Sequence, residues 1–293
     1  MSLLVEQLHP LVLNVGLAVQ NADWNWKNVS SPFMRLYYVT EGTAQVVLPE
    51  GVELLSPDNL YFIPAFTKHS YVCDTYFSHY YIHIYEEPGQ GEGLLDEWEL
   101  PMSIPAGELD LLLVRRLCTI NPHMSLAKSD PATYDNNPTL KHNLLVNKQR
   151  TFCDKVESRG IVLQLLSHFL KRAVPRANSH DPRIETAISH IRKHICEPLD
   201  IDTLAAGACL SKDHFIRLFK QEMGETPLQY ILLRKMEKAQ LLLVTDNMPV
   251  KSVAYALAFE DYSYFNRLFK KITGVTPKDY RTMHFSSPAG TTL

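Results

Sequence analysis

An internal repeat near the C-terminus constrains the fold of this chain more than any other feature of its sequence. Residues 214–230 read HFIRLFKQEMGETPLQY, and residues 264–280 read YFNRLFKKITGVTPKDY. Nine of the seventeen aligned positions are identical at an offset of fifty. The identical pairs are Phe215/Phe265, Arg217/Arg267, Leu218/Leu268, Phe219/Phe269, Lys220/Lys270, Gly224/Gly274, Thr226/Thr276, Pro227/Pro277 and Tyr230/Tyr280. Two copies are too few for a solenoid, which needs about three stacked repeats, so we expect one helical unit present twice.

Caps and breakers divide the repeat region into short helices. Asp181-Pro182 is typical of an N-cap followed by the first helical residue, and Thr226-Pro227 repeats this pattern. Ser211 and Asp261 are N-cap candidates before the two basic helices, and Gly224 ends the first of them. The predicted helices span residues 182–195, 201–208, 211–222, 227–244, 250–259 and 261–272.

Each copy pairs a short helix with a second helix whose outer face is basic. Two helices joined by a tight turn in this way are typical of a helix-turn-helix unit. Phe215 and Phe219 form the apolar stripe of one second helix, and Phe265 and Phe269 form the stripe of the other. The helix over 227–244 would extend about 27 Å, which suits two reading heads about one DNA turn, ~34 Å, apart.

Residues 185–282 resemble the AraC-type DNA-binding domain, and SVAYALAFEDYSYFNRLFKKITGVTPKDYR carries the most specific part of the match. The resemblance implies two recognition helices that enter successive segments of the major groove on double-stranded DNA. It implies a bacterial, cytoplasmic transcription regulator that is not an enzyme and for which RNA polymerase is a candidate further partner. Activator is the expected class, although the sequence does not decide between activation and repression. Matched by motif position, the base-reading candidates are Asp213, Ile216, Arg217, Tyr262, Ser263, Asn266 and Arg267.

The chemistry of these side chains agrees with the roles that the resemblance implies. Arginine can grip guanine O6 and N7 with two hydrogen bonds, and asparagine can do the same to adenine N6 and N7. Lysines suit phosphate contacts, which position a protein without reading sequence. The phosphate candidates are Lys212, Lys220, Lys270 and Lys271. Solvated helix faces are the plain alternative, and Arg217 and Arg267 could also brace the fold by pairing with an acidic neighbour.

The sequence departs from the family pattern at four positions. Family turns commonly carry glycine where this chain has Cys209 and Ala258. If those turns need a left-handed backbone, a residue with a Cβ costs about 1 kcal/mol or slightly more. Asp213 and Ile216 are unusual groove-facing residues, because an aspartate repels phosphate and accepts only from cytosine N4. We therefore expect the second unit to read more bases than the first.

The front half of the chain predicts strands. Short β-rich runs between residues 34 and 86 are separated by turns such as Glu41-Gly42 and 56–59, which favours a small sandwich or barrel. The pieces VTEGTAQVVL and LLSPDNLYFIP resemble the cupin-like sensor domains of bacterial regulators. The expected fold class is α+β multidomain. It has an N-terminal cupin-like β-barrel or sandwich with following helices, and a C-terminal all-α domain of two helix-turn-helix units joined by a long helix.

Aromatic and histidine side chains of the front half are candidates for an effector pocket. They are Trp26, Tyr38, His69, Tyr71, Tyr81 and His83. Trp24 and Trp26 would share one strand face and could instead only cover the core. Three inward imidazoles, His69, His79 and His83, could bind a metal. The close His-x-His pair of metal-binding cupins is absent after Gly42, so we expect no metal and no cofactor, and neutral or pocket-lining histidines instead.

The middle of the chain predicts helices and a boundary. Residues 151–174 form the longest helical pattern of the front half, which either covers the sheet or forms a homodimer interface. Residues 175–183 are rich in turn formers and make the best linker. The expected division is a sensor and dimerisation domain over 1–174, a linker over 175–183, a DNA-binding domain over 184–283 and a flexible tail over 284–293.

Composition limits the alternatives. The net charge is −3, but residues from Asp181 onward carry 15 Lys and Arg against 13 Asp and Glu, so the acidic excess lies in the front half. The five cysteines show no C-x-x-C spacing, which disfavours a zinc site or disulfide framework. No run reaches the ~18 apolar residues of a membrane span, so no membrane partner is expected. Besides a DNA-binding regulator with a small-molecule effector, two hypotheses stay open. One is a cupin-type metal-binding or enzymatic domain fused to a DNA reader, and the other is a ligand-free dimerisation barrel.

Overall fold

The computed structural model of the chain divides into two compact units, with the boundary between Ala173 and Val174. Each unit is described here by itself. The structure describes residues 8–22, 24–49, 51–86, 94–135, 137–175, 181–245 and 248–282. Most of the predicted linker, residues 176–180, and the predicted tail, residues 284–293, lie outside the described residues.

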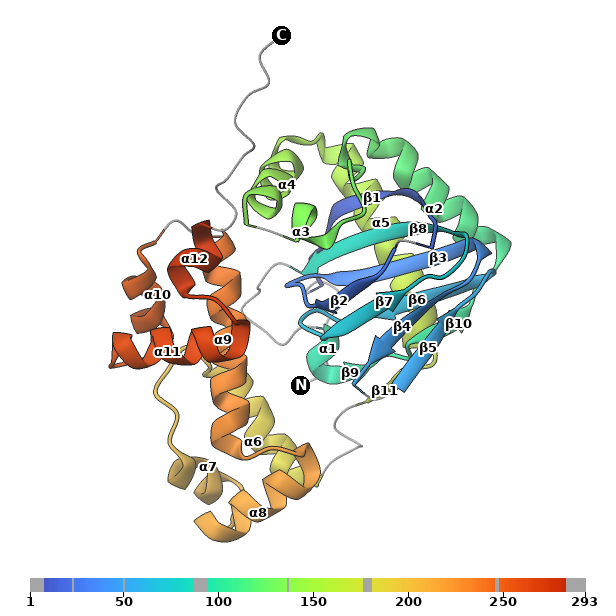
Figure 1. Ribbon diagram of the computed structural model, residues 1–293. Coiled ribbons are helices and arrows are strands. Elements are labelled where there is room, and N and C mark those ends of the chain that lie inside the picture. The colour runs from blue at the N-terminus through green and yellow to red at the C-terminus, as the bar shows by residue number, and fades with distance from the viewer. Residues whose placement is uncertain are drawn as a thin grey trace. The chain divides into compact units, whose positions relative to one another are not determined.

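Two antiparallel sheets form the front of the N-terminal unit (Figure 1). The five-stranded sheet has the order β1 (Pro10–Gln20), β8 (Phe77–Glu86), β3 (Met34–Gly42), β6 (Asn59–Ile63) and β10 (Ser103–Pro105). The four-stranded sheet has the order β2 (Trp26–Val29), β7 (His69–Val72), β4 (Ala44–Leu48) and β5 (Gly51–Leu55). Among the described strands the two sheets stay separate, so they form a sandwich, and the expected closed barrel is not confirmed.

The alternation of side chains explains how the two sheets face each other. In β4, Ala44 and Val46 are buried while Gln45 and Val47 are exposed, as the period of two requires. The buried side chains of both sheets meet in one cluster, which we call the inter-sheet core. It comprises Trp24, Val29, Tyr37, Val39, Ala44, Val46, Leu55, Tyr61, Ile63, Tyr71, Cys73, Phe77 and Tyr81.

The turn between β3 and β4 depends on one glycine. Gly42 has a φ of 70°, and a Cβ added there would lie 1.9 Å from the carbonyl oxygen of Tyr76. Only glycine tolerates both the left-handed backbone and this close approach. The predicted turn signal at this position is therefore a steric requirement of the sandwich.

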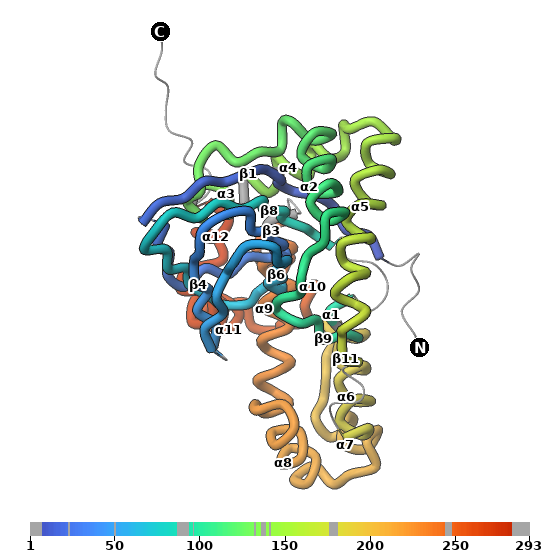
Figure 2. Tube along the Cα trace, turned by 90° about the vertical axis from the view of Figure 1, so that its right-hand side faces the viewer, coloured from blue at the N-terminus to red at the C-terminus, as the bar shows by residue number. Residues whose placement is uncertain are grey.

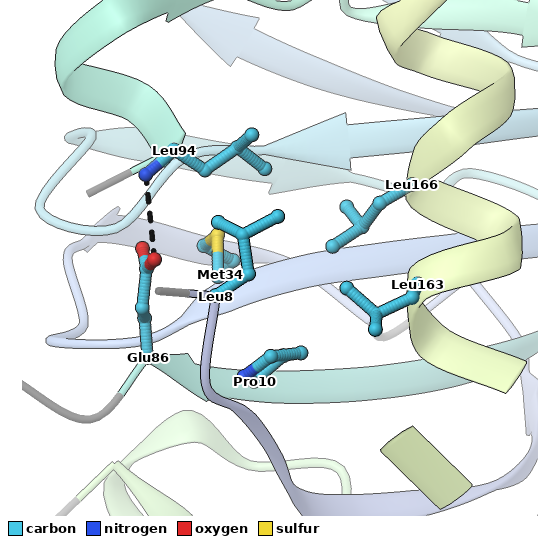
Figure 3. A pocket seen from close by; sticks show the side chains of 7 residues that line it. All are labelled: Leu8, Pro10, Met34, Glu86, Leu94, Leu163 and Leu166. Carbon is cyan, nitrogen blue, oxygen red and sulfur yellow. Dashed lines mark hydrogen bonds between the residues drawn. The ribbon is translucent and has the colours of Figure 1, made fainter. Parts of the chain in front are cut away.

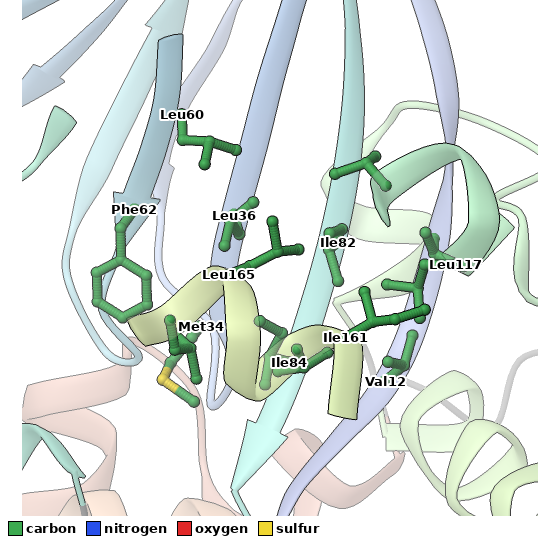
Figure 4. Packing of buried hydrophobic residues seen from close by; sticks show 14 of the residues in the cluster. Val12, Met34, Leu36, Leu60, Phe62, Ile82, Ile84, Leu117, Ile161 and Leu165 are labelled. Carbon is green, nitrogen blue, oxygen red and sulfur yellow. The ribbon is translucent and has the colours of Figure 1, made fainter. Parts of the chain in front are cut away.

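Helices cover the outer face of the five-stranded sheet. The helix α5 (Phe152–Leu170) crosses the strands, and its Ile161 and Leu165 point toward Leu36 and Ile82 (Figure 4). The helix α2 (Glu108–Ile120) packs beside it and adds Val114 and Leu117 to the same cluster. Of the two roles predicted for residues 151–174, covering the sheet is confirmed.

The N-terminal unit has further elements besides these. They are α1 (Leu94–Glu97), β9 (Trp98–Glu99), the 3-10 helix η2 (Pro122–Met124), α3 (Pro131–Tyr134) and α4 (Asn137–Gln149). The helix α4 lies against β1, which carries a bulge between Val12 and Asn14.

The C-terminal unit begins with the short strand β11 (Val174–Pro175) and is otherwise helical. Its helices are α6 (Pro182–Lys193), α7 (Ile201–Gly207), α8 (Lys212–Met223), α9 (Pro227–Thr245), α10 (Val250–Ala256), α11 (Tyr262–Thr273) and α12 (Pro277–Thr282). Two separate cores repeat the same design, one around Phe215 and Phe219 and one around Phe265 and Phe269. Figures 1 and 2 show α7 and α8 at one end of α9 and α10 to α12 at its other end.

The long helix α9 belongs to both cores. Tyr230 and Ile231 near its start pack with the first pair of phenylalanines, and Met236, Ala239 and Leu243 pack with the second. Its 19 residues extend about 28 Å at ~1.5 Å per residue. The structure thus has the two helical units and the connecting helix that the repeat predicted. Within the described residues, no helix combines the length and apolarity that crossing a bilayer would require.

Candidate nucleic-acid interface

The recognition-helix candidate α8 turns one face to its core and the opposite face to solvent. Phe215 and Phe219 are fully buried, one turn apart, so residues on the other side of the helix point outward. The exposed side chains of this face are Lys212, Asp213, His214, Arg217, Lys220 and Gln221. Of the predicted base readers in this helix, Asp213 and Arg217 lie on the exposed face, and Ile216 lies half-buried at its edge.

The helix α11 repeats this arrangement with different outward side chains. The exposed residues opposite the buried phenylalanines are Ser263, Tyr264, Arg267, Lys270 and Lys271, and Ile272 near the end of the helix is also exposed. Tyr262 and Asn266, both predicted to read bases, are half-buried, and the Asn266 side-chain amide donates a hydrogen bond of 2.9 Å to the Tyr262 carbonyl. The structure therefore places Ser263 and Arg267 at the centre of this face and Asn266 at its margin.

Neighbouring carboxylates change the charge that these faces offer. The Lys212 Nζ lies 2.8 Å from the Asp202 carboxylate, and this hydrogen bond raises the pKa of Lys212. A phosphate would have to compete with Asp202 for that ammonium group. Arg267 is 70% exposed and lies 3.9 Å from Asp261, itself 61% exposed. Such a long exposed pair is worth little, so Arg267 is not braced in the way that the alternative interpretation required.

Three exposed residues on these faces, His214, Gln221 and Tyr264, were not among the sequence-based candidates. His214 and Tyr264 occupy the same position in the two copies, directly before the first buried phenylalanine of each stripe. Both can donate and accept hydrogen bonds, and both have an aromatic face. Their alignment in the repeat was the available signal, but they differ in type and so did not appear among the identical pairs.

The turn before each recognition helix contains a non-glycine residue with a left-handed backbone, the conformation in which a Cβ is strained. Cys209 has a φ of 55° and Ala258 a φ of 56°. The Leu210 amide donates to the Ala205 carbonyl at 2.9 Å and the Phe259 amide donates to the Ala254 carbonyl at 3.0 Å. Together with the bonds from Cys209 and Ala258 themselves, these are Schellman motifs, in which the left-handed position is usually glycine.

A buried lysine connects the two helix-turn-helix units. Lys235 lies in the middle of α9 and is 5% exposed. Its Nζ donates to the carbonyl of Glu197, which precedes α7, at 3.0 Å and to the carbonyl of Leu257, the C-cap of α10, at 2.8 Å. Burial lowers the pKa of Lys235. In the sequence this residue is a basic interruption of an apolar helix face. In the structure its ammonium group is the hydrogen-bond donor for these two backbone carbonyl groups.

The predicted effector-pocket residues do not all lie together. Tyr71 and Tyr81 belong to the inter-sheet core and Trp26 packs against it. Tyr38 lies in the cluster on the other face of the five-stranded sheet, beneath the covering helices. The prediction that Tyr38 joins the others is wrong, because side chains of a strand alternate between its two faces and Tyr37 takes the inner position.

Hydrogen bonds tie the inner aromatic residues to a histidine. The hydroxyl groups of Tyr37 and Tyr71 lie 2.6 Å apart, and the Tyr71 hydroxyl lies 2.8 Å from the His69 Nε2. Burial lowers the pKa of His69 and that of His79 to about 3. Burial also lowers the pKa of His83. All three imidazoles are therefore neutral near pH 7. Among the described residues, no three His, Cys, Asp or Glu side chains gather as a metal site would require.

A small apolar pocket lies elsewhere in the N-terminal unit (Figure 3). Leu8, Met34, Leu94 and Leu166 are among its lining residues, and Glu86 accepts a hydrogen bond from the Leu94 amide at its rim. Its volume of about 10 Å³ has room for about one water molecule. It is too small to receive an effector in this conformation.

Comparisons with known proteins concern mainly the C-terminal unit. Residues 204–283 match the family model described as a helix-turn-helix domain. The arabinose operon regulatory protein of Salmonella typhimurium is 34% identical over 130 residues, which are 42% of this chain and 46% of that protein. The MmsAB operon regulatory protein of Pseudomonas aeruginosa is 39% identical over 93 residues, 32% of this chain and 30% of that protein. The chain thus spans less than half the length of these relatives.

Solved structures include similar domains. The DNA-binding domain of AdpA in complex with a target DNA is 29% identical, covers 37% of this chain and 98% of its own, and has a TM-score of 0.35. Unsaturated fatty acid bound ToxT from Vibrio cholerae is 13% identical, covers 96% of this chain and 98% of its own, and has a TM-score of 0.49.

Proposed function

We propose that this chain, whose C-terminal unit is an AraC-type helix-turn-helix domain, is a transcription regulator that binds a specific DNA sequence. The observation that carries the proposal is the duplicated recognition helix, α8 and α11, each with an exposed arginine at the same position. Arg217 and Arg267 project from the faces opposite the buried phenylalanines. Arginine on an exposed recognition helix is the side chain that most often reads guanine.

We propose different contributions for the outward residues of the two helices. Asp213, Arg217 and Ile216 would contact bases from α8, and Ser263 and Arg267 would do so from α11, with Tyr262 and Asn266 at the groove's edge. Lys220, Lys270 and Lys271 are exposed and suit phosphate contacts. Lys212 would do the same after leaving Asp202. The second helix would read more bases, because α8 presents a carboxylate at Asp213 that repels the DNA backbone.

Selection of binding sites from random DNA tests this function. Purified full-length chain is expected to enrich one sequence with two short conserved segments about one helical turn, ~10 bp, apart. Enrichment of no sequence, with binding equal on all DNA, would contradict a sequence-specific regulator.

A regulatory role for the N-terminal unit is the second part of the proposal. A cupin-like sensor would bind a small molecule near the inter-sheet core, where His69, Tyr71, Tyr81 and His83 place polar atoms among apolar side chains. A rival function, a metal-binding or enzymatic front domain, needs a group of metal ligands that the described residues do not provide. Thermal-shift screening of the full chain against small metabolites is expected to find a ligand that stabilises it. If none does, the ligand-free dimerisation barrel becomes the better account.

We also propose a homodimer that forms through the helices outside the sheet. Four large apolar side chains of α2 and α5 are exposed, among them Phe152 at 79% and Leu112 at 54%. The two helices pack side by side and carry the Arg116–Glu157 ion pair on their surface. Apolar side chains in such a position suit a two-fold interface. Sedimentation of Phe152→Asp is expected to give monomers where the unaltered chain gives dimers. We place this dimer in the cytoplasm, with RNA polymerase as a further partner.

A further inference from the structure

A row of polar side chains crosses the inner face of the five-stranded sheet. Arg35 of β3 and Asn14 of β1 both stand opposite His83 of β8 in the strand register. Arg35 and His83 are each 1% exposed and Asn14 is 4% exposed. Positions of this kind are normally apolar, because burial of a charged or polar group without partners is costly. The row therefore needs partners, and the structure shows which ones it has.

The segment from η2 through α3 supplies the partner of Arg35. The Asp135 carboxylate, directly after α3, lies 3.1 Å from the Arg35 Nη2, and the Ser31 hydroxyl contacts both groups. The ring of Tyr134 lies over the ring of His83 with centroids 4.9 Å apart. Burial raises the pKa of Asp135. A carboxylate from the chain itself thus fills the space in front of a buried guanidinium.

Within the part of the chain that the structure describes, two buried nitrogen atoms in this row, one of them a donor of Arg35, lack partners that Asp135 could have supplied. Neither the Arg35 Nε nor the His83 Nδ1 has a hydrogen-bond partner among the described residues. Asp135 engages the guanidinium through a single nitrogen, Nη2, although carboxylates bind arginine best through two parallel hydrogen bonds. Buried polar atoms without partners are rare in folded proteins and often mark a binding site. Both orphaned nitrogens belong to the side chains that Asp135 and Tyr134 cover.

Polar contacts hold the covering segment in place. The Leu126 amide donates to the Tyr81 hydroxyl at 2.6 Å, and the Gln20 side chain donates to the Ser129 hydroxyl at 2.7 Å. Further along, the Asn143 amide donates to the Asn14 side chain at 3.2 Å. Water can replace each of these hydrogen bonds when the segment detaches. Leu126 packs against the inter-sheet core and Tyr134 is buried, so detachment would also expose these two side chains.

We propose that Arg35, Ser31 and His83 form a binding site for a small carboxylate ligand, which Asp135 occupies in the ligand-free chain. The ligand carboxylate would take both Arg35 Nε and Nη2, and the displaced Asp135 would carry residues 125–135 away from the sheet. The effect of this displacement on DNA binding rests on the proposed function of the chain. Binding of the carboxylate itself does not, and it can be tested without DNA.

Chemical rescue tests the site directly. In the full-length Asp135→Ala variant, the space left by the missing carboxylate is expected to bind formate, added as the sodium salt. Thermal unfolding of the variant measures this binding. All three tryptophans, Trp24, Trp26 and Trp98, lie in the N-terminal unit, so their fluorescence reports that unit. At a formate concentration about tenfold above its dissociation constant, the melting temperature is expected to rise by about 3–6 °C. Sodium chloride at equal ionic strength is the reference.

Two further variants make the result decisive. Arg35→Met combined with Asp135→Ala replaces the buried pair by apolar groups, which proteins often tolerate. The melting temperature of this double variant is expected not to change when formate is added. If Asp135→Ala does not fold, Asp135→Asn keeps the shape, and hydrogen exchange of residues 125–135 is expected to be faster than in the unaltered chain. Equal responses to formate and chloride, or a formate response that persists without Arg35, would overturn the proposal.

Discussion

The ammonium group of Lys235 donates a hydrogen bond of 2.8 Å to the carbonyl oxygen of Leu257. Leu257 is the C-cap of α10, where the helix dipole is negative and carbonyl groups lack helical partners. The same ammonium group donates to Glu197 in the first helix-turn-helix unit. One buried charge on α9 therefore satisfies a backbone carbonyl group in each of the two units.

Replacement of Lys235 by methionine is expected to uncouple the two reading heads. The two carbonyl groups lose their donor, at a cost of about 1–3 kcal/mol in the free energy of unfolding. Denaturant unfolding by circular dichroism measures this cost. In addition, affinity for the selected site should become less sensitive to a base pair inserted between its two segments. Lys193→Met, at an exposed position of α6, is the matched control. Unchanged sensitivity to the insertion would show that Lys235 does not set the spacing.

The two strained turns predict stabilising substitutions. Cys209→Gly and Ala258→Gly each relieve a left-handed residue with a Cβ, and each should raise the free energy of unfolding by up to about 1 kcal/mol. The controls are Ala206→Gly and Ala256→Gly, which lie in helices and are exposed. These should lower stability by about 0.8–1 kcal/mol. A loss of stability in all four variants would mean that the turns are not strained.

Acid is expected to destabilise the N-terminal unit through its buried histidines. The pKa of His79 is lowered by burial from 6.5 to about 3. The unfolded chain therefore binds a proton that the folded chain refuses, and stability that is complete above pH 6.5 falls as the pH drops toward 3. Each such histidine contributes a slope of about 1.4 kcal/mol per pH unit within this window.

Removal of one histidine measures its share of this slope. His79→Gln should flatten the dependence of unfolding free energy on pH between 6 and 4 by about one proton. The tryptophan fluorescence of the full chain follows this unfolding. His123→Gln, at an exposed position, is the control. Identical slopes in both variants would show that His79 titrates normally.

Lysine contacts with phosphate predict a change in salt dependence. Lys270 is exposed on α11, and Lys270→Ala should weaken binding to specific and random DNA alike. The slope of log affinity against log salt should become shallower by about 1. The measurement is fluorescence anisotropy across a range of salt concentrations. An unchanged slope would remove Lys270 from the phosphate contacts.

Much of the C-terminal fold could be predicted because its rules are local. The caps Ser211 and Asp261 and the left-handed Gly224 mark helix ends within a residue of their observed positions. Because the unit occurs twice in the sequence, each copy supported the helix boundaries predicted for the other. The role of Lys235 could not be predicted, because its partners, Glu197 and Leu257, come from elements 38 and 22 residues away.

The N-terminal unit was harder to predict because its strands pair across long distances. The strand β1 was missed, since it is buried on both faces for much of its length and shows no alternation. Tyr38 was assigned to the wrong face because its neighbour Tyr37 is equally aromatic. The pairing of Arg35 with Asp135 joins residues 100 apart, and no local pattern of the sequence indicated it.

The central claim is that α8 and α11 read separate segments of one DNA site. The most direct measurement compares Arg217→Ala and Arg267→Ala on the selected site and on copies with single base pairs changed. Each variant is expected to lose about 1–3 kcal/mol of specific binding and to stop discriminating bases in one segment only, Arg217 in one and Arg267 in the other. Equal losses on specific and random DNA, or loss of discrimination at the same base pairs in both variants, would contradict the account.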